Sequence, residues 1–591
     1  MGNAHADRSA VGDEGRAGRG LRIRAGAAMA LVLVAFLLLA GRLGQMQISQ
    51  GAEYRRLADQ QQMLDRELAA WRGRILDSRG RLLASTVQRW SVYADPQAIA
   101  DPDGAAVLLG STLDLPVGRL RERLARDRSF VWIKRQVTER EADAVRGLAL
   151  PGIHMRRESK RLYPQGRLAA HVIGFTDIDG RGLAGIEARM DALLRGRPGS
   201  ESVLCDGGRR IICPPAGNRT REPFDGFDVQ LTLDAYVQAI AEEELAAAVR
   251  SHQPECATAL VMDVLDGSLL AMASWPDFDP QAPADSPVRN QRNVAICDAY
   301  EFGSSFKPVV AALALEDGTV RPETTFDCHQ GRWRIGRRTL NDVHAYGLLT
   351  VSDILCHSSN IGMAQVSMAL GLERLYAGIR RFGFGRPTGI ALPGESGGIM
   401  RPFRTWNDYS VVSVSFGQEL AVTALSLVRA FAALANGGRL PQPHIVRSIR
   451  HTTTGREIYS ASGALGATHP VSAATSGQVL TMMRRVVEEG TGRQAISAEY
   501  ALAGKTGTAQ LLTEDGRGYS NSRHLSTFVA VGPVPDCRIA VLVTLKAPTR
   551  HGYYGGTVAG PAVRNICLRT LRHLRVPPSE PSPILALGAH P

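Results

Sequence analysis

The sequence predicts an α+β fold that is anchored to a membrane by one N-terminal helix. Three observations support this prediction: a long apolar run near the N-terminus, a strand, helix and hairpin that begin near residue 226, and two strands followed by a helix near the C-terminus. Hairpin-connected strands with separate groups of helices are typical of an antiparallel sheet covered by helices. A length of 591 residues leaves room for at least two folded domains.

Residues 25–41 form an uncharged apolar run between Arg24 and Arg42. The run reaches the lower length limit for a helix that spans a bilayer, and residues 43–44 extend it. A cleaved signal peptide is the alternative, but the run exceeds the usual apolar segment of such peptides and no clear Ala-x-Ala site follows. Arginines are more frequent before the run than after it, so the positive-inside rule predicts a cytoplasmic tail over residues 1–24 and an external remainder.

Residues 45–225 are predicted to form the first external domain. Residues 45–68 have a helical composition and are predicted to form a stalk next to the membrane. From residue 71 onward the segment contains short apolar runs interrupted by Gly and Pro, which predicts short elements without indicating any chemistry.

Residues 226–576 are predicted to form the second external domain. Apolar residues alternate from Val229 to Leu233 as in a strand, and Asp234 is a good N-cap for a helix over residues 235–250. The hairpin signal Asp266-Gly267 lies between two further strands. The remaining predicted elements are strands over residues 257–264, 268–273, 525–531 and 539–545 and a closing helix over 559–575, before a Pro-rich tail at 577–591.

Composition excludes several classes of protein. The chain is 44% hydrophobic and 21% charged, which is ordinary for a globular protein and excludes wholesale disorder. The net charge of +12, from 69 basic and 57 acidic residues, is mild for this length, and no basic stripe is interleaved with aromatic residues. We therefore expect no nucleic-acid partner.

The eight cysteines do not predict a metal site or a disulfide framework. No Cys-x-x-Cys pair and no zinc-type spacing of His and Cys is present, so no metal and no cofactor is expected. Cys205 and Cys213 are close enough in sequence to pair in an oxidising compartment, although scattered structural thiols are favoured.

Lysine is rare in this arginine-rich chain, with only five among 69 basic residues. Arginine keeps its proton in proteins, whereas a desolvated lysine can lose it. A site that needs a deprotonatable amine must therefore retain its lysine. Two of the five, Lys307 and Lys505, lie inside motifs of catalytic type.

The first motif is Ser304-Ser305-Phe306-Lys307. Gly303 suits a tight turn into a helix, and Pro308 is tolerated in a first turn, whose N–H groups lack partners. Residues at i and i+3 share a helix face, so the Ser304 hydroxyl and the Lys307 amine can meet there. A serine nucleophile with an amine base needs this arrangement, although one Ser-x-x-Lys alone is a weak signal.

The second motif is Ser358-Ser359-Asn360, at a predicted helix start. Ser358 could pass a proton, and the amide of Asn360 could hold a peptide bond. Taken alone, the motif is better explained as a helix N-cap.

The third motif is Lys505-Thr506-Gly507-Thr508. Its cation and two hydroxyls suit a carboxylate ligand, and Gly507 allows a substrate backbone to approach a strand closely. A phosphate-binding loop would need a glycine where Glu499 stands, which disfavours an NTPase.

In this order the three motifs are the set typical of penicillin-binding proteins and class A β-lactamases. Between residues 71 and 575 the sequence resembles the class B penicillin-binding proteins. Besides the three motifs, the resemblance rests on a membrane-proximal box (RGRILDSRG, 72–80), on a pedestal motif (RLYPQG, 161–166, with His171, residues 174–175 and 185–187), and on residues 417–418, 422–423, 433–438 and 553–556.

Within that family, two regions are similar to the division-specific septal transpeptidases rather than to the elongation enzymes. They are VYADP (92–96) and LPGIH (150–154), the second running on to HVIGFT (171–176). One departure is Phe302, which stands where the family usually has proline. We expect it to alter the approach to the helix rather than the chemistry.

The resemblance implies a serine D,D-transpeptidase that cross-links peptidoglycan in septal wall synthesis. Residues 45–225 would be a pedestal or dimerisation-type non-catalytic domain and residues 226–576 the transpeptidase domain. The expected ligands are D-Ala-D-Ala stem peptides, an amine acceptor, and β-lactams that mimic the donor. The expected partners are a membrane-embedded glycan polymerase and divisome proteins, at an inner membrane with the N-terminus inside.

The resemblance also implies a role for each motif residue. Ser304 would attack the donor carbonyl, with Lys307 as its base and the backbone N–H groups of Ser304 and Thr508 as the oxyanion hole. The other implied roles are proton delivery by Ser358, binding of the donor peptide by Asn360, and binding of its carboxylate by Lys505, Thr506 and Thr508, with Gly507 in the same substrate-binding strand.

Three alternatives remain. An elongation-type transpeptidase would use the same residues. A β-lactamase would need a deacylating glutamate; Glu395 is the best placed in sequence, but Ile399 replaces the asparagine expected after it. A non-catalytic scaffold or antibiotic sensor would have no need to keep Lys307, and the tail before the membrane segment is too short for a signalling domain.

Overall fold

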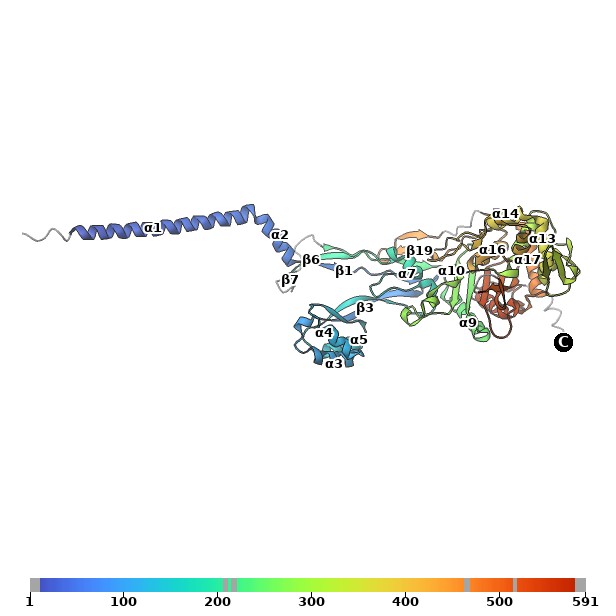
Figure 1. Cartoon of the computed structure of the whole chain (residues 1–591), viewed down its shortest axis with the longest axis horizontal. Coiled ribbons are helices and arrows are strands. Elements are labelled where there is room, and N and C mark those ends of the chain that lie inside the picture. Colours follow the sequence, from blue (N-terminus) through green and yellow to red (C-terminus); the bar gives the residue numbers. More distant parts are fainter. Residues whose placement is uncertain (1–10, 206–210, 214–219, 462–467, 514–517, 580–591) are drawn as a thin grey trace, which may run out of the picture. The chain divides into compact units, whose positions relative to one another are not determined.

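The computed structural model describes residues 11–205, 211–213, 220–461, 468–513 and 518–579. The chain divides into two compact units (Figure 1). The first combines residues 1–70 with residues 197–224, and the second combines residues 71–196 with residues 225–591.

The first unit contains the predicted membrane helix. Helix α1 (Val11–Gly44) includes all of the predicted span and continues into a π-helical turn, Gln45–Ser49. Within Arg19–Ser49, an 18-residue window has a mean hydropathy of 2.4, and the apolar side chains of the stretch are exposed. Exposed apolar residues along a helix of this length are typical of a segment that faces lipid.

The predicted stalk helix over residues 45–68 is wrong in its last part. Helix α2 (Gly51–Gln62) ends early, and strand β1 (Met63–Leu68) pairs antiparallel with β6 (Gly199–Cys205). Strands β7 (Ile211–Cys213) and β8 (Thr220–Arg221) also pair with β6. The partner of β1 comes from a segment more than a hundred residues away, so helical composition nearby is overridden by a long-range pairing.

The second unit begins with the pedestal. Strand β3 pairs antiparallel with β2, β4 and β5, and three helices cover the end of this sheet with a small apolar core. The strands are β2 (Ile75–Leu76), β3 (Leu82–Ala94), β4 (Val131–Val137) and β5 (Ile153–Leu162). The three covering helices are α3 (Pro102–Leu113), α4 (Val117–Leu124) and α5 (Glu139–Gly147), and the short helices α6 (Ala170–Ile173), α7 (Gly185–Arg189) and α8 (Asp191–Leu194) follow β5.

The pedestal sheet continues into the second half of the chain. Strand β2 pairs in parallel with β9 (Phe227–Leu231), which pairs with β19 (Val446–His451) and through it with β20 (Glu457–Ser460). These strands form one seven-stranded sheet. The predicted strand near Val229 therefore belongs to this sheet.

A buried ion network fixes the base of the pedestal. The carboxylate of Glu187, on α7, pairs with Arg72 and with Arg161, each at 2.6 Å, and Arg72 also pairs with Asp191 at 2.7 Å. The side chain of Glu187 is fully buried, and the two arginines are nearly so. A buried charge is tolerated when it is paired in this way.

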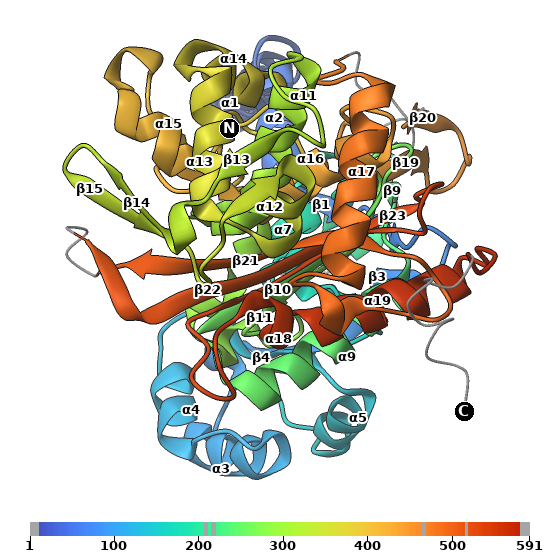
Figure 2. The ribbon, with the colours of Figure 1, turned by 90° about the vertical axis from the view of Figure 1, so that its right-hand side faces the viewer.

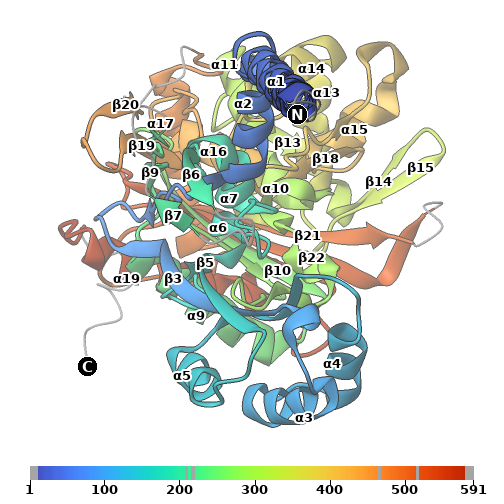
Figure 3. The ribbon, with the colours of Figure 1, turned by 90° about the vertical axis from the view of Figure 1, so that its left-hand side faces the viewer.

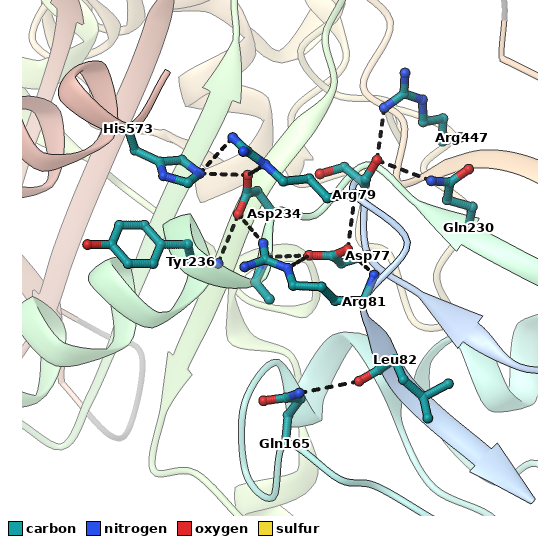
Figure 4. Close-up of polar contacts among 12 residues, drawn as sticks. Asp77, Arg79, Arg81, Leu82, Gln165, Gln230, Asp234, Tyr236, Arg447 and His573 are labelled. Carbon is teal, nitrogen blue, oxygen red and sulfur yellow. Dashed lines mark hydrogen bonds and ion pairs between the residues drawn. The ribbon is translucent and has the colours of Figure 1, made fainter. Parts of the chain in front are cut away.

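A second polar network joins the turn between β2 and β3 to the catalytic half (Figure 4). Asp77 accepts from Arg81, and Asp234 accepts from both Arg79 and Arg81. His573, near the C-terminal end of the last helix, lies 2.8 Å from the same Asp234 carboxylate. As predicted, Asp234 is also an N-cap, because its side chain accepts from the Tyr236 N–H.

The catalytic half is built on a five-stranded antiparallel sheet in the order β11-β10-β23-β22-β21. Helices α9 and α19 cover one face, and α11, α12, α16 and α17 lie on the other (Figure 2). The strands are β10 (Cys256–Asp263), β11 (Leu269–Trp275), β21 (Ala503–Leu512), β22 (Tyr519–Gly532) and β23 (Ile539–Lys546), and the helices are α9 (Ala235–His252), α11 (Lys307–Glu316), α12 (Val351–His357), α16 (Ala424–Ala435), α17 (Ala473–Glu488) and α19 (Gly560–His573). The predicted α+β fold is confirmed.

Smaller elements surround this sheet (Figure 3). They are the helices α10 (Val294–Cys297), α13 (Asn360–Leu370), α14 (Leu372–Arg381), α15 (Asp408–Ser415) and α18 (Gly555–Val558), and the strands β12 (Ala299–Tyr300), β13 (Thr325–Asp327), β14 (Arg332–Ile335), β15 (Arg338–Asn341), β16 (Leu348–Thr350), β17 (Ile399–Met400) and β18 (Leu420–Thr423). Cys205 is a free, buried thiol, and the side chain of Cys213 lies outside the described residues.

Glu187→Gln should destabilise the protein by about 3–5 kcal/mol, because it leaves two buried guanidinium groups without their shared carboxylate. Urea unfolding of the full chain in detergent would measure the loss. Glu457→Gln is the matched control, since Glu457 pairs with Arg450 on the surface, where such a pair contributes below about 1 kcal/mol. Equal unfolding midpoints for the two variants would contradict this assignment of Glu187.

Candidate active site

The first motif lies in a turn that leads into α11. Residues Gly303–Phe306 form a 3₁₀ turn, and Pro308 lies in the first turn of the helix, as predicted. Gly303 has a left-handed φ of 57°, and a Cβ atom added there would lie 3.1 Å from the Thr508 carbonyl oxygen. Glycine is therefore needed both for the turn and for its close packing against β21.

The buried amine of Lys307 is directed toward the second motif. It donates to the Ser358 carbonyl at 2.5 Å, to Asn360 Oδ1 at 2.8 Å and to Ser358 Oγ at 3.3 Å. Ser304 is half-buried in the same site, and its hydroxyl makes no hydrogen bond to any described residue. The expected Ser304–Lys307 hydrogen bond is not made, because the buried amine satisfies its donors with the second motif instead.

The second motif connects two helices. Ser358 ends α12 with a left-handed φ of 61°, and Ser359 is the N-cap of α13, accepting from the Gly362 N–H at 2.9 Å. The N-cap explanation thus holds for Ser359, while Ser358 and Asn360 on either side of it bind the buried lysines. A left-handed serine costs backbone energy, and such strain is concentrated at functional sites.

The third motif lies on β21, which is an edge strand of the five-stranded sheet. Lys505 donates to Ser358 Oγ at 2.9 Å, and the Thr506 and Thr491 hydroxyls are 2.8 Å apart. Thr508 Oγ1 accepts from the Gly555 N–H at 3.0 Å. An edge strand has one set of free backbone groups, which can pair with an extended peptide.

Gly507 has a close neighbour that the sequence did not indicate. A Cβ atom at this position would lie 2.1 Å from Ser305 Oγ and 2.5 Å from the Phe302 carbonyl oxygen. The glycine is thus required for the first motif to pack against β21. Phe302 itself is 2% exposed and packs edge-on to Tyr300, which places the departure from the family pattern in the core.

Burial changes the acidity of both lysines. Desolvation and the nearby Lys505 charge lower the pKa of Lys307 well below its ordinary value, while the charge of Asp342 opposes this shift. Desolvation lowers the pKa of Lys505 to about 7. An amine with a pKa near 7, such as that of Lys505, can exchange protons near neutral pH.

Asp342 was not found by sequence reasoning. Its carboxylate accepts from the backbone N–H groups of Asn360 at 2.5 Å and Ile361 at 3.1 Å, and from Ser359 Oγ at 2.5 Å. It therefore holds the N-terminus of α13, where a negative charge is favourable. A single aspartate after a hairpin carries no motif, so only the fold brings it to the site.

The three motifs surround one cleft of about 840 Å³. Ser304, Ser358, Asn360, Thr506 and Thr508 line it, while the two lysines lie fully buried behind them. The rest of the described lining is rich in aromatic and imidazole rings: Tyr346, His344, His357, His524, Tyr553 and Tyr554.

Glu395, the glutamate considered for a β-lactamase, does not line this cleft. Its carboxylate accepts from the backbone N–H and the hydroxyl of Thr388, both at 2.6 Å, and from the Gly389 N–H at 2.9 Å. These bonds close a turn, so the carboxylate is engaged in structure rather than directed at an acyl group.

Two family models match the chain. The penicillin-binding protein transpeptidase domain matches residues 257–568, and the penicillin-binding protein dimerisation domain matches residues 67–231. The match places the three motifs in the first of these domains and the pedestal in the second.

Curated relatives are similar over most of the chain. A probable peptidoglycan D,D-transpeptidase, PenA, of Neisseria meningitidis is 36% identical, over 87% of this chain and 86% of its own length. The peptidoglycan D,D-transpeptidase FtsI of Escherichia coli is 31% identical, over 93% of this chain and 91% of its own. The stage V sporulation protein D of Bacillus subtilis is 32% identical, over 93% of this chain and 85% of its own length.

Solved structures share the fold. Penicillin-binding protein 3 of Mycobacterium tuberculosis has a TM-score of 0.68 and 26% identity, covering 87% of this chain and 99% of its own. A peptidoglycan synthetase of Bifidobacterium adolescentis has a TM-score of 0.70 and 26% identity, covering 88% of this chain and 98% of its own. With the apolar helix α1, these similarities indicate a single-pass protein of the inner membrane. The chain belongs to the class B penicillin-binding proteins and is a serine-type peptidoglycan D,D-transpeptidase.

Proposed function

We propose that Ser304 is the acylated nucleophile of this transpeptidase and that Lys307 is its base. The observation that carries the proposal is the fully buried Lys307 amine, with its lowered pKa, one helical turn from a hydroxyl that opens into the cleft. A neutral amine can accept the Ser304 proton as the oxygen attacks the carbonyl between the last two D-alanines of a stem peptide. The backbone N–H groups of Ser304 and Thr508 then stabilise the oxyanion.

The proton leaves through the second motif. Lys307 lies 3.3 Å from Ser358 Oγ, and Ser358 Oγ lies 2.9 Å from Lys505. Ser358 can therefore relay a proton from Lys307 to the nitrogen of the departing D-alanine, as the C–N bond breaks and the ester to Ser304 forms. Asn360 Oδ1 accepts from Lys307 and one amide hydrogen donates to the Asn341 carbonyl, which leaves the second amide hydrogen to hold the donor peptide.

The third motif binds the donor. Protonated Lys505 supplies a positive charge, and the hydroxyls of Thr506 and Thr508 line the cleft beside it. A terminal carboxylate is the natural ligand of such a group. The donor backbone then runs along the free edge of β21 beside Gly507.

In the second half of the reaction, an amine of a neighbouring stem peptide attacks the ester carbonyl. The new amide C–N bond forms as the ester C–O bond breaks, and the amine proton returns to Ser304. The product is a cross-link. A β-lactam acylates the same serine, but its ring-opened product does not depart and blocks the acceptor.

The setting of this reaction is proposed to be the division septum, with an elongation role as the alternative. The support is the similarity of residues 92–96 and 150–154 to septal transpeptidases. The positive-inside rule places the N-terminus in the cytoplasm and the catalytic half outside. The pedestal is proposed to contact a membrane-embedded glycan polymerase and divisome proteins.

Fluorescent penicillin should label the full chain in detergent, and Ser304→Ala should abolish the label because no nucleophile remains. The label on the wild type should persist for an hour after free drug is removed, since the acyl-enzyme is resolved by an amine and not by water. Label that fades within minutes would indicate a hydrolase. Folded wild-type protein without label would favour a non-catalytic scaffold.

The acylation rate should depend on pH in a bell shape, with the falling limb near pH 7. Deprotonation of Lys307 supplies the base and gives the rising limb, while deprotonation of Lys505 removes the carboxylate-binding charge and gives the falling limb. In Lys505→Arg, the guanidinium keeps its proton throughout. This variant should acylate more slowly than the wild type, and its rate should rise with pH and not fall up to pH 9. A wild-type rate that climbs steadily to pH 9 would contradict the role of Lys505.

Depletion of the protein in its native bacterium should block septation while growth continues. Fluorescence microscopy of cell shape and of a functional fusion at mid-cell would measure this. Altered cell width with normal septa would assign the protein to elongation instead.

A further inference from the structure

A hairpin beside the cleft carries four exposed arginines that have no acidic partner among the described residues. Strands β14 and β15 pair antiparallel over Arg332–Asn341. Within the described part of the chain, no ion pair involves any of the arginines of this hairpin, which we call the basic ledge: Arg332, Arg334, Arg337 and Arg338. Four cations on one small element, without an ion-pair partner among the described residues, create a strong local positive potential.

The basic ledge is an ordered element. The Tyr409 hydroxyl accepts from the Arg337 N–H at 3.4 Å, and the Arg338 guanidinium lies 4.7 Å from the Tyr409 ring centroid. On the same strand pair, Trp333 stacks on His329 with ring centroids 5.5 Å apart. The alternation of exposure along β14 leaves Arg332 and Arg334 together on the exposed face.

The basic ledge adjoins the cleft, because the end of strand β15 leads into residues that line it. Arg332 lies opposite Asn341 in the register, and the Asn341 carbonyl accepts from the Asn360 side-chain amide at 3.3 Å. The next residue, Asp342, already lines the cleft. Figures 2 and 3, which view opposite sides, both show the hairpin projecting on the same side as the outer ends of β21 and β22.

The chain beyond the basic ledge forms an aromatic surface on the cleft wall. Tyr346 stacks on His357 with ring centroids 5.3 Å apart and an interplanar angle of 24°, and His344 meets Tyr346 edge-on at 6.0 Å. All three residues line the cleft. The proposed donor occupies the other wall, along β21, so this surface has no role in donor binding.

We propose that the basic ledge, with the adjoining wall of His344, Tyr346 and His357, binds the acceptor stem peptide through that peptide's carboxylates. The inference rests on the proposed function, because it assigns the second substrate of the same cleft. A stem peptide carries free carboxylates as well as its reactive amine, and guanidinium groups bind carboxylates through paired hydrogen bonds. The planar rings offer a surface on which the peptide backbone can pack.

The proposal is tested by removing charge from the basic ledge and from a matched hairpin. Arg332→Gln with Arg334→Gln is the test variant, and Arg456→Gln is the control, since Arg456 is an exposed arginine in the turn between β19 and β20. The full chain in detergent would receive a thioester donor and one of two acceptor tetrapeptides, either with free carboxylates or with the same carboxylates amidated.

Transfer to the carboxylated acceptor should fall about fivefold in the double variant, in line with two exposed ion pairs. Transfer to the amidated acceptor should not change, and Arg456→Gln should match the wild type with both. The fall in transfer to the carboxylated acceptor should become smaller in high salt, which screens exposed charges. An equal loss with both acceptors, a loss in the control, or no loss in the double variant would overturn the proposal.

Equilibrium binding separates this proposal from the catalytic one. Binding of the carboxylated tetrapeptide to the full chain needs no acyl-enzyme, so it can be measured even if penicillin fails to label Ser304. Weaker binding by the double variant than by Arg456→Gln supports the basic ledge whatever the nucleophile is. Equal binding by the two variants overturns it, even where labelling of Ser304 succeeds.

Discussion

The burial of two lysine amines against one serine is the constraint on which the active site depends. Lys307 and Lys505 are both fully buried, and both donate to Ser358 Oγ. Removing two such groups from water without pairing each to a carboxylate is unfavourable for the charged forms, so burial lowers the pKa of both amines. Gly303 and Gly507 serve this arrangement, because they allow the first motif and β21 to approach closely enough to enclose the amines.

In the pedestal, by contrast, buried cations are paired directly with a carboxylate. Arg72 and Arg161 share the carboxylate of Glu187, so each buried cation there has a direct counter-charge. Fully paired charges resist titration and hold segments in one geometry. The same chain therefore uses compensated charge where it needs rigidity, and uncompensated amines where it needs a proton acceptor.

Sequence reasoning was most successful where a signal is local. The strand, N-cap and helix around Asp234, the central hairpin and the three motifs are all encoded in a few neighbouring residues, and the structure brings the motifs into one cleft. It failed for β1, whose partner is distant in sequence, and for Asp342, which no motif marks. The contact of Gly507 with Ser305 was not foreseen either, since it depends on how two distant segments meet, and the place of Gly507 in the substrate-binding strand stays a prediction.

The geometry of the cleft also explains why the acyl group should await an amine. Among the described residues that line it, the carboxylates are Asp342 and Glu489. Asp342 accepts from two N–H groups and a hydroxyl at the N-terminus of α13, and Glu489 is paired with Arg485 at 2.9 Å. Glu395 closes a turn elsewhere. With these carboxylates engaged, none is free to activate water, whereas an incoming amine brings its own nucleophilic electron pair and can pass its proton to Lys307.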